Sequence, residues 1–342
     1  MYLENWIARD NGMSNLYINE NGAVVGISDG KCQITKDGEV IESIPVNTLD
    51  GITILGKSQL TTQMVEYCLT NGIAVSYFSK GGKYFGRLES GKHANAVRQR
   101  LQCRLYEEEF ALHFSKNIIA AKIHNQKVVL NRYASSGEAD CSENIKKLNI
   151  LKKKAESAKA FSDLGGYEGM AARLYFEGLG KCVDEEFAFS GRSRRPPKDE
   201  FNSMIGLGYT ILIREIQCQL ESHGLNAYLG FMHRDRYNAP SLACDLVEEW
   251  RAIIVDAAVM SLISKHMIHK EHFQRENESV YLNKEGCKIF LNWLERKLNT
   301  KIRYIDDAES MDFRHAIDAQ IISLIKAMDN NDAGLYQPIR VR

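Results

Sequence analysis

The sequence changes character near residue 92, and this change constrains the fold more than any other feature. Before it, "NLYINENGAVVGISDGKCQITKDGEVIESIPV" contains short β-branched runs separated by Asn-Gly and Asp-Gly pairs, which are typical of tight hairpins. From about residue 95 to about residue 327, apolar residues instead recur with helical periodicity. We therefore predict an α+β protein, with an N-terminal antiparallel β domain that includes one small helix at 1–92 and an all-α C-terminal domain at 93–342.

Charge and cysteine usage limit the partners and the compartment. The 44 basic and 44 acidic residues of the 342-residue chain cancel, so a DNA-binding surface would have to be a local patch. The 8 cysteines form no C-x-x-C pair, and the N-terminus lacks the apolar core of a signal peptide. No run of about 18 apolar residues is present. We expect a cytoplasmic protein with no membrane contact.

The segment "GITILGKS", residues 51–58, satisfies the pattern of a phosphate-binding loop. In such a loop, backbone amides between the glycines cradle phosphate after a strand has ended. Here the residues between the glycines, 52–55, are themselves typical of a strand. We interpret the segment as a strand, a turn and a helix start, rather than as the site of an NTPase.

The segment "HMIHKEH", residues 266–272, spaces three histidines at three-residue steps. On a helix the first two could share a metal, but all three would be strained. Charged neighbours indicate an exposed surface, and a fourth zinc ligand is not evident. Exposed histidines are the favoured interpretation.

A predicted helix at 242–257 is bordered by acidic residues. Winding it at about 100° per residue gives one apolar face. The carboxylates in a single arc beside that face are Asp245, Glu248, Glu249 and Asp256, whereas Arg251 lies off the arc. His233 precedes Glu248 by 15 residues, across a loop that could fold it back. Carboxylates with an imidazole suit Mg²⁺ or Mn²⁺, although ordinary amphipathic helices also carry acidic flanks.

A second acidic position lies in "DLGGYEGMAARLYFEGL", residues 163–179. On a helical wheel Glu168 falls between Ala172 and Tyr175, among small and aromatic neighbours, where a carboxylate needs a cationic partner. The alternative is a glutamate favoured by the dipole at a helix N-terminus. Basic residues surround this region, in "KKLNILKKKAESAKAF" upstream and in "SGRSRRPPKDEF" downstream, where a stiff loop could contact phosphate or simply be solvated.

Three ordered segments carry a resemblance to a known family: "GGYEGMAARLYF", "RRPPKDEFNSMIGLGYTIL" and "MHRDRYNAPSLACDLVEEWR". Together with "RQRLQC" and "KIHNQKVVLNR", they resemble the CRISPR-associated integrase family, whose members insert new spacers into a CRISPR array. The resemblance runs from Met13 onward, so residues 1–12 look like an additional segment. It implies a β domain for dimerisation and an α domain that holds one divalent metal.

The resemblance also implies roles for individual residues. Glu168, His233 and Glu248 would be the catalytic metal ligands for Mg²⁺ or Mn²⁺, with Asp245 as an auxiliary acid. Candidate phosphate contacts are Arg192, Arg194, Arg195, Arg234 and Arg236.

The implied activity is that of a metal-dependent DNA endonuclease and integrase, which joins 3′-hydroxyl ends of spacer DNA to a CRISPR repeat by transesterification. The implied partners are double-stranded DNA, a second copy of the chain, and a small companion subunit, with two integrase dimers per companion dimer. The alternative is a DNA-binding scaffold with a structural, catalytically silent metal site.

Overall fold

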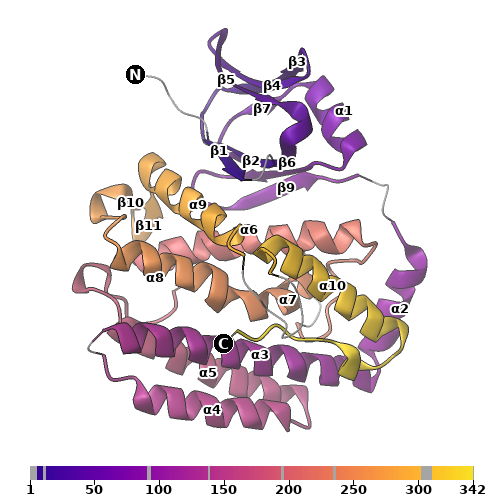
Figure 1. Ribbon diagram of the computed structural model, residues 1–342, viewed down its shortest axis with the longest axis vertical. Coiled ribbons are helices and arrows are strands. Elements are labelled where there is room, and N and C mark those ends of the chain that lie inside the picture. The colour runs from indigo at the N-terminus through magenta and orange to yellow at the C-terminus, as the bar shows by residue number, and fades with distance from the viewer. Residues whose placement is uncertain are drawn as a thin grey trace. The chain divides into compact units, whose positions relative to one another are not determined.

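The protein divides into two compact units, Met1–Lys92 and His93–Arg342 (Figure 1). The structure is a computed structural model. The residues that it describes are 6–10, 13–90, 94–137, 139–193, 196–233, 236–301 and 310–341. The first unit is rich in strands and the second is rich in helices, which confirms the predicted fold class. None of the helices seen in these ranges combines the length and apolar character that a membrane crossing requires.

The first unit contains two sheets. The five-stranded sheet has the order β1 (Trp6–Asp10), β2 (Met13–Ile18), β6 (Leu49–Leu55), β8 (Ala74–Phe78) and β9 (Tyr84–Leu88). The four-stranded sheet has the order β5 (Glu39–Pro45), β4 (Lys31–Lys36), β3 (Val24–Ser28) and β7 (Gln59–Leu60). Strand β1 pairs antiparallel with β2, so part of the additional segment at 1–12 extends the first sheet.

The hairpins of the second sheet follow the predicted turn chemistry. Asp29-Gly30 and Asp37-Gly38 connect β3 to β4 and β4 to β5, and all four residues have positive φ, between 51° and 87°. Asp and Gly tolerate this left-handed conformation, which matches the twist of the flanking strands. The Asp-Gly pairs therefore did predict these two antiparallel connections.

The expectation of a purely antiparallel domain is wrong for the centre of the first sheet. Strand β6 pairs in parallel with both β2 and β8. The chain forms β3, β4 and β5 in the other sheet between β2 and β6, and α1 (Thr62–Asn71) intervenes before β8. Parallel neighbours need such long connections, whereas hairpins give antiparallel ones. The buried side chains of both sheets and α1 form one core, which includes Leu16, Val25, Ile34, Ile52 and Met64.

The "GITILGKS" segment has the structure that its apolar residues predict. Strand β6 runs through its first five residues, and the side chains of Ile52 and Ile54 are buried in the sheet core. The Ser58 hydroxyl donates a hydrogen bond to the carbonyl oxygen of Glu20 at 2.6 Å. Strand β7 follows the segment and α1 begins only at Thr62, so the predicted helix start is wrong. The glycines therefore do not lead directly into a helix N-terminus that could receive a phosphate.

The second unit is mainly helical. Its longer helices are α2 (Ala96–Tyr106), α3 (Glu109–Ser136), α4 (Ser142–Glu156), α5 (Phe161–Lys181), α6 (Glu200–Ser222), α7 (Ser241–Arg251), α8 (Ala257–Ser264), α9 (Lys284–Leu298) and α10 (Phe313–Asp329). Helix α3 packs against α4, α5 and α7, and it therefore lies at the centre of the unit (Figure 1).

The second unit also contains a hairpin, which the all-α prediction missed. Strands β10 (Phe273–Glu276) and β11 (Ser279–Leu282) pair antiparallel across a turn in which Asn277 has a φ of 56°. The preceding "HMIHKEH" segment is not helical, because α8 ends at Ser264 and His266 has a φ of 50°. His266 and His269 are exposed as predicted, while His272 is buried and accepts a hydrogen bond from the His269 amide.

Candidate metal centre

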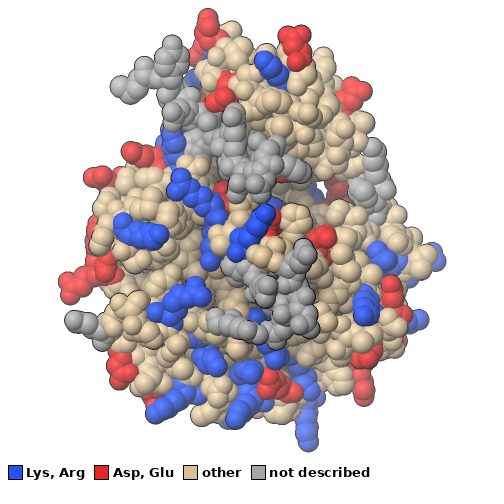
Figure 2. Space-filling model, in the orientation of Figure 1, with Lys and Arg blue, Asp and Glu red and all other residues tan. Residues whose placement is uncertain are grey.

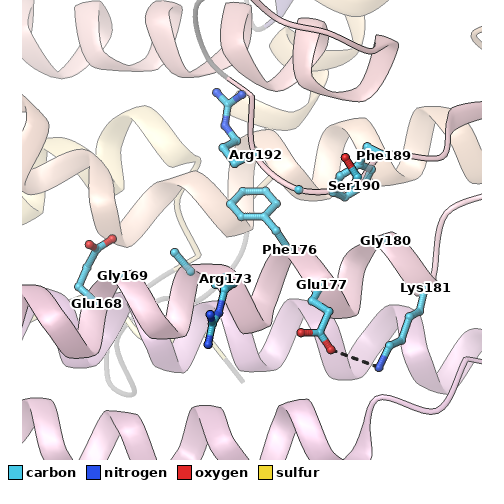
Figure 3. Close-up of a pocket in the computed structure, with 12 residues that line it drawn as sticks. Glu168, Gly169, Arg173, Phe176, Glu177, Gly180, Lys181, Phe189, Ser190 and Arg192 are labelled. Carbon is cyan, nitrogen blue, oxygen red and sulfur yellow. Dashed lines mark ion pairs between the residues drawn. The ribbon is translucent and has the colours of Figure 1, made fainter.

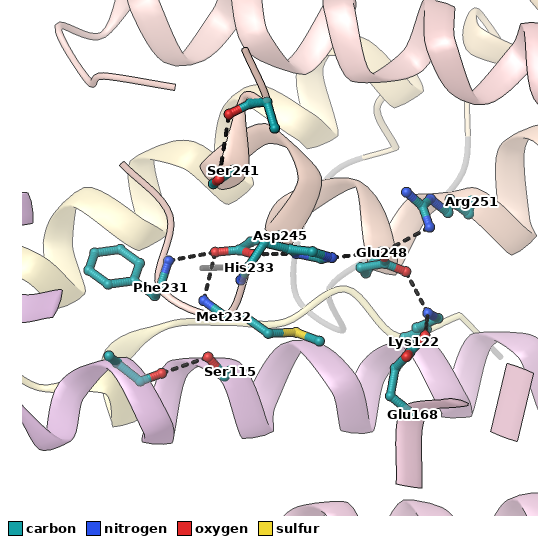
Figure 4. Close-up of polar contacts among 12 residues, drawn as sticks. Ser115, Lys122, Glu168, Phe231, Met232, His233, Ser241, Asp245, Glu248 and Arg251 are labelled. Carbon is teal, nitrogen blue, oxygen red and sulfur yellow. Dashed lines mark hydrogen bonds and ion pairs between the residues drawn. The ribbon is translucent and has the colours of Figure 1, made fainter. Parts of the chain in front are cut away.

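The carboxylate of Asp245 holds the loop that precedes α7. Asp245 is fully buried, and its oxygens accept hydrogen bonds from the backbone amides of Phe231 at 2.7 Å, Met232 at 3.0 Å and His233 at 2.9 Å (Figure 4). The His233 Nδ1 atom lies 2.7 Å from the same carboxylate. Because a carboxylate oxygen accepts hydrogen bonds, Nδ1 is the donor, and in the neutral ring Nε2 then carries the free lone pair. That Nε2 atom lies 4.0 Å from the nearer carboxylate oxygen of Glu248.

The carboxylates of Glu168 and Glu248 meet at one lysine. Lys122 of α3 forms an ion pair with Glu168 of α5, and its Nζ atom lies 2.6 Å from Oε2 of Glu248 on α7 (Figure 4). Arg251, one turn further along α7, contacts the other oxygen of Glu248 at 2.8 Å. Three helices and the loop that carries His233 therefore bring their charged groups to one place.

The charges around Glu248 shift two pKa values. Burial favours the neutral form of the Glu248 carboxyl, but Arg251 and Lys122 outweigh it and lower its pKa to about 2. Burial likewise works to lower the pKa of His233, whereas the hydrogen bond and the charge of Asp245 raise it, and the pKa of His233 ends above its ordinary value. The Glu248 carboxyl group is therefore ionised at neutral pH.

Glu249 lies outside the centre, although the helical arc placed it beside Glu248. Its fully buried carboxyl group accepts hydrogen bonds from the Tyr336 hydroxyl at 2.8 Å and from the Ile339 amide at 2.6 Å. Asn125 of α3 binds the same C-terminal segment, because its side chain bonds the Ile339 carbonyl at 2.9 Å and the Val341 amide at 3.1 Å. Residues 336–341 thus line the side of α7 that Glu249 occupies.

Asp256 is also separate from the centre. Its oxygens accept hydrogen bonds from the hydroxyls of Tyr209 at 2.6 Å and Tyr175 at 3.0 Å. The predicted helix at 242–257 is not continuous, because a π-helical turn at Ala252–Asp256 separates α7 from α8. A π turn contains more residues than an α turn, so side chains beyond it leave the arc that regular winding predicts.

The sequence analysis did not identify Lys122 as a partner of the two glutamates, and it placed Arg251 away from the acidic residues that it contacts. Lys122 lies within the apolar run "IIAAKI" at 118–123, where its neighbours are buried, and an ammonium in such a run needs a carboxylate partner. That single charged residue was the available signal. Arg251 lies off the predicted arc, but residues three apart on a helix are neighbours, and its long side chain reaches Glu248.

The donor set of Glu168, His233 and Glu248 fits a hard divalent cation, with two carboxylates and one imidazole. The buried Oε2 atom of Glu248 forms no hydrogen bond with the described residues, although it contacts the charge of Lys122. In these same ranges, no group of three His, Cys, Asp or Glu side chains is already arranged to hold a metal ion. The chemistry fits, but the ammonium of Lys122 lies between the two glutamates.

A pocket of about 650 Å³ adjoins the centre along α5 (Figure 3). Glu168 lines one end of it, and the ion pair between Glu177 and Lys181 lies farther along the same helix, with a distance of 3.7 Å. The aromatic rings of Phe176 and Phe189 also line the pocket. The pocket therefore offers both apolar and charged surfaces beside Glu168.

The arginines predicted to contact phosphate have different environments. Arg192 lines the pocket, donates a 2.8 Å hydrogen bond to the side-chain oxygen of Asn202, and lies over the ring of Tyr209, 5.3 Å from its centroid. Arg236 is exposed in the loop after His233. The candidates that lie outside the described residues are Arg194, Arg195 and Arg234.

Basic side chains gather on one face of the second unit. Figure 2 shows them along the lower edge, over the position of α4 in Figure 1. Four of the five α4 lysines are exposed, namely Lys146, Lys147, Lys153 and Lys154. A chain without net charge thus has a local basic surface, as a DNA-binding role would require.

A strand-rich unit followed by a helical unit with one acidic, histidine-containing centre defines the structural class of this chain. The family model described as CRISPR associated protein Cas1 matches residues 16–296. The CRISPR-associated endonuclease Cas1 of Mycobacterium tuberculosis (strain ATCC 25618 / H37Rv) is 33% identical over 321 residues, which cover 93% of this chain and 94% of that protein. The chain therefore belongs to the Cas1 family.

Solved structures share the fold. A casposase bound to integration product superposes with a TM-score of 0.82 at 25% identity, over 96% of each chain. A chain of a Cas6-RT-Cas1–Cas2 complex also gives a TM-score of 0.82, at 24% identity, and the match covers 100% of this chain and 37% of that longer one.

Proposed function

We propose that this protein is a divalent-metal-dependent DNA endonuclease and integrase, which joins the 3′-hydroxyl ends of new spacer DNA to a CRISPR repeat. The observation that carries the proposal is the convergence of Glu168, His233 and Glu248, from two helices and a loop far apart in the sequence. The names of its relatives, CRISPR-associated endonucleases, and the likeness to a casposase bound to integration product support the same reaction class.

Glu168, Glu248 and the Nε2 atom of His233 would hold one Mg²⁺ or Mn²⁺. When bound, this ion would polarise a phosphoryl oxygen and favour ionisation of the attacking 3′-hydroxyl, or of water in the hydrolytic reaction. Asp245 fixes the ring of His233 and its protonated Nδ1, so that Nε2 is presented as a ligand. Arg251 balances the charge of Glu248 and keeps this buried carboxylate ionised.

The DNA would follow the basic surface toward the centre. Arg192, held by Asn202 at the edge of the pocket, and Arg236, in the exposed loop after His233, are suited to contact phosphate oxygens. We further propose that the first unit forms a homodimer and that two such dimers bind one dimer of a small companion subunit. The Cas1–Cas2 complex among the structural neighbours supports this partner.

The test is strand transfer from labelled duplex DNA with Mn²⁺. Glu168→Ala and His233→Ala are expected to lower joining by more than about 100-fold, because losing even a hydrogen-bond partner of a metal ligand costs roughly 10- to 100-fold. Duplex binding should persist in both variants. Glu177→Ala, on the same helix and lining the same pocket, is the matched control and should join DNA normally.

Undiminished joining by Glu168→Ala and His233→Ala would reject the proposed centre. Tight duplex binding by the wild-type protein with no joining under any divalent metal would instead favour the scaffold with a silent metal site.

A further inference from the structure

Lys122 is a buried cation at the place where a metal would bind. Its side chain is only 6% exposed, and it contacts both Glu168 and Glu248 from the middle of α3 (Figure 4). Side chains on either side of it in the helix, Ala121 and Ile123, are fully buried. The ammonium is therefore enclosed by the helix bundle and faces the two carboxylates.

The two glutamates and the lysine depend on one another. Two carboxylates that converge on one point repel, and a buried ammonium without a counter-charge is costly. Glu248 is 3% exposed, so solvent does little to screen its charge from Glu168. The ammonium removes the repulsion and holds both side chains toward the same point before any metal is present.

A metal and this ammonium exclude each other. Mg²⁺ binds carboxylate oxygens at about 2.1 Å, and Mn²⁺ prefers the same oxygen ligands. Arg251 already contacts Oε1 of Glu248, which leaves Oε2 for a metal. An ion that contacts this Oε2 and Oε1 of Glu168 must lie close to both atoms. The Nζ atom of Lys122 lies there, in contact with both oxygens. Only one of the two cations can occupy the position.

We propose that Lys122 is the resident cation of the metal-free centre and that a divalent ion binds by displacing its ammonium. This inference rests on the proposed function. The exposed side of the position is at Glu168, whose side chain is 26% exposed and lines the pocket, so the displaced ammonium moves past Glu168 toward the pocket. Lys122 is thus a positioning residue that holds the ligands together and lowers the affinity for the metal.

The experiment measures Mn²⁺ binding by calorimetry in the intact protein. Lys122→Met keeps an unbranched chain of similar length but removes the competing charge, and it should bind Mn²⁺ at least about tenfold more tightly, which corresponds to about 1.4 kcal/mol. Lys127→Met makes the same substitution at a half-buried position of the same helix and should leave the affinity unchanged. Equal or weaker binding by Lys122→Met overturns the inference.

Mn²⁺ binding by Glu168→Gln distinguishes a failure of the proposed metal centre from a failure of the displacement of Lys122. Wild-type binding that disappears in Glu168→Gln supports the centre. No Mn²⁺ binding by the wild-type protein overturns the centre, and the inference with it.

A second measurement uses the wild-type chain and does not depend on a variant that folds. Acetic anhydride labelling followed by mass spectrometry should modify Lys122 several-fold faster once Mn²⁺ is bound, because the displaced amine becomes accessible. Lys127 serves as the internal reference. Unchanged or slower labelling of Lys122 in the presence of saturating Mn²⁺ overturns the displacement.

Discussion

Asp245→Asn provides the sharpest test of how the histidine loop is held. The wild-type carboxylate accepts four hydrogen bonds, three from backbone amides and one from the His233 ring. An amide has one acceptor oxygen, and its NH₂ group would face two of these donors. Two lost bonds to a charged group, at roughly 1.5–3 kcal/mol each, lower the free energy of unfolding by about 3–6 kcal/mol.

The same substitution changes the titration of His233. Asp245 raises the pKa of this imidazole, so the interaction stabilises the folded state below the unfolded pKa of about 6.5 and is lost as pH rises through the folded pKa. The destabilisation by Asp245→Asn should therefore be larger at pH 5 than at pH 8. In a ring-proton NMR titration the pKa of His233 should fall.

Urea denaturation at both pH values measures the loss, and the exposed Asp329→Asn is the matched control, with an expected change of less than about 0.5 kcal/mol. A loss of less than about 1 kcal/mol for Asp245→Asn, against the 3–6 kcal/mol worked from its hydrogen bonds, would refute the reasoning. So would an unchanged pKa of His233.

Two further substitutions test the surroundings of the centre. Burial raises the pKa of Glu249 to about 8, so its contribution to stability is present below pH 4.5 and is lost as pH rises toward 8. Glu249→Gln should remove about 4 kcal/mol of this pH dependence between pH 5 and pH 8, by urea unfolding. An equal loss of stability by the wild-type protein and Glu249→Gln between pH 5 and pH 8 would contradict the raised pKa of Glu249. In Gly230→Ala, the new Cβ would lie 2.7 Å from the backbone of Ser241 and 3.0 Å from Asp245, which should cost about 1–3 kcal/mol and weaken Mn²⁺ binding. Gly86→Ala, with no neighbour within 4 Å, is its control, and equal melting temperatures would contradict the steric argument.

The sequence predicted those turns and helices whose conformation depends on a few neighbouring residues. Asp29-Gly30 and Asp37-Gly38 form the expected hairpins, because a two-residue turn depends on its own φ angles. The parallel partners of β6 come from the other side of long connections, and no short-range pattern encodes them. The β10–β11 hairpin was missed because Asn277 adopts positive φ without a following glycine.

In the site, too, contacts within one helix could be predicted from the sequence, whereas contacts between distant segments could not. The spacing of Asp245 and Glu248 on one helix could be read from the sequence, because both lie before the π turn. Asp256 lies at its end, where regular winding no longer applies. Lys122 could not be assigned to the glutamates, since its contact joins helices whose packing is set by the whole bundle. The proposed ligand roles of Glu168 and His233 rest on the residue pattern together with the family resemblance, and the structure adds the neighbours of both side chains.

The pairing of Glu249 with residues 336–341 has a consequence for the order in which the protein matures. Helix α7 carries Glu248 toward the centre, and its neighbouring side, at Glu249, is contacted by Tyr336 and Ile339, which are about ninety residues later in the chain. When α7 has just emerged from the ribosome, Tyr336 and Ile339 have not yet emerged, so Glu249 lacks both of these hydrogen-bond donors. Helix α7 can therefore gain these two contacts only after the C-terminal segment has been synthesised.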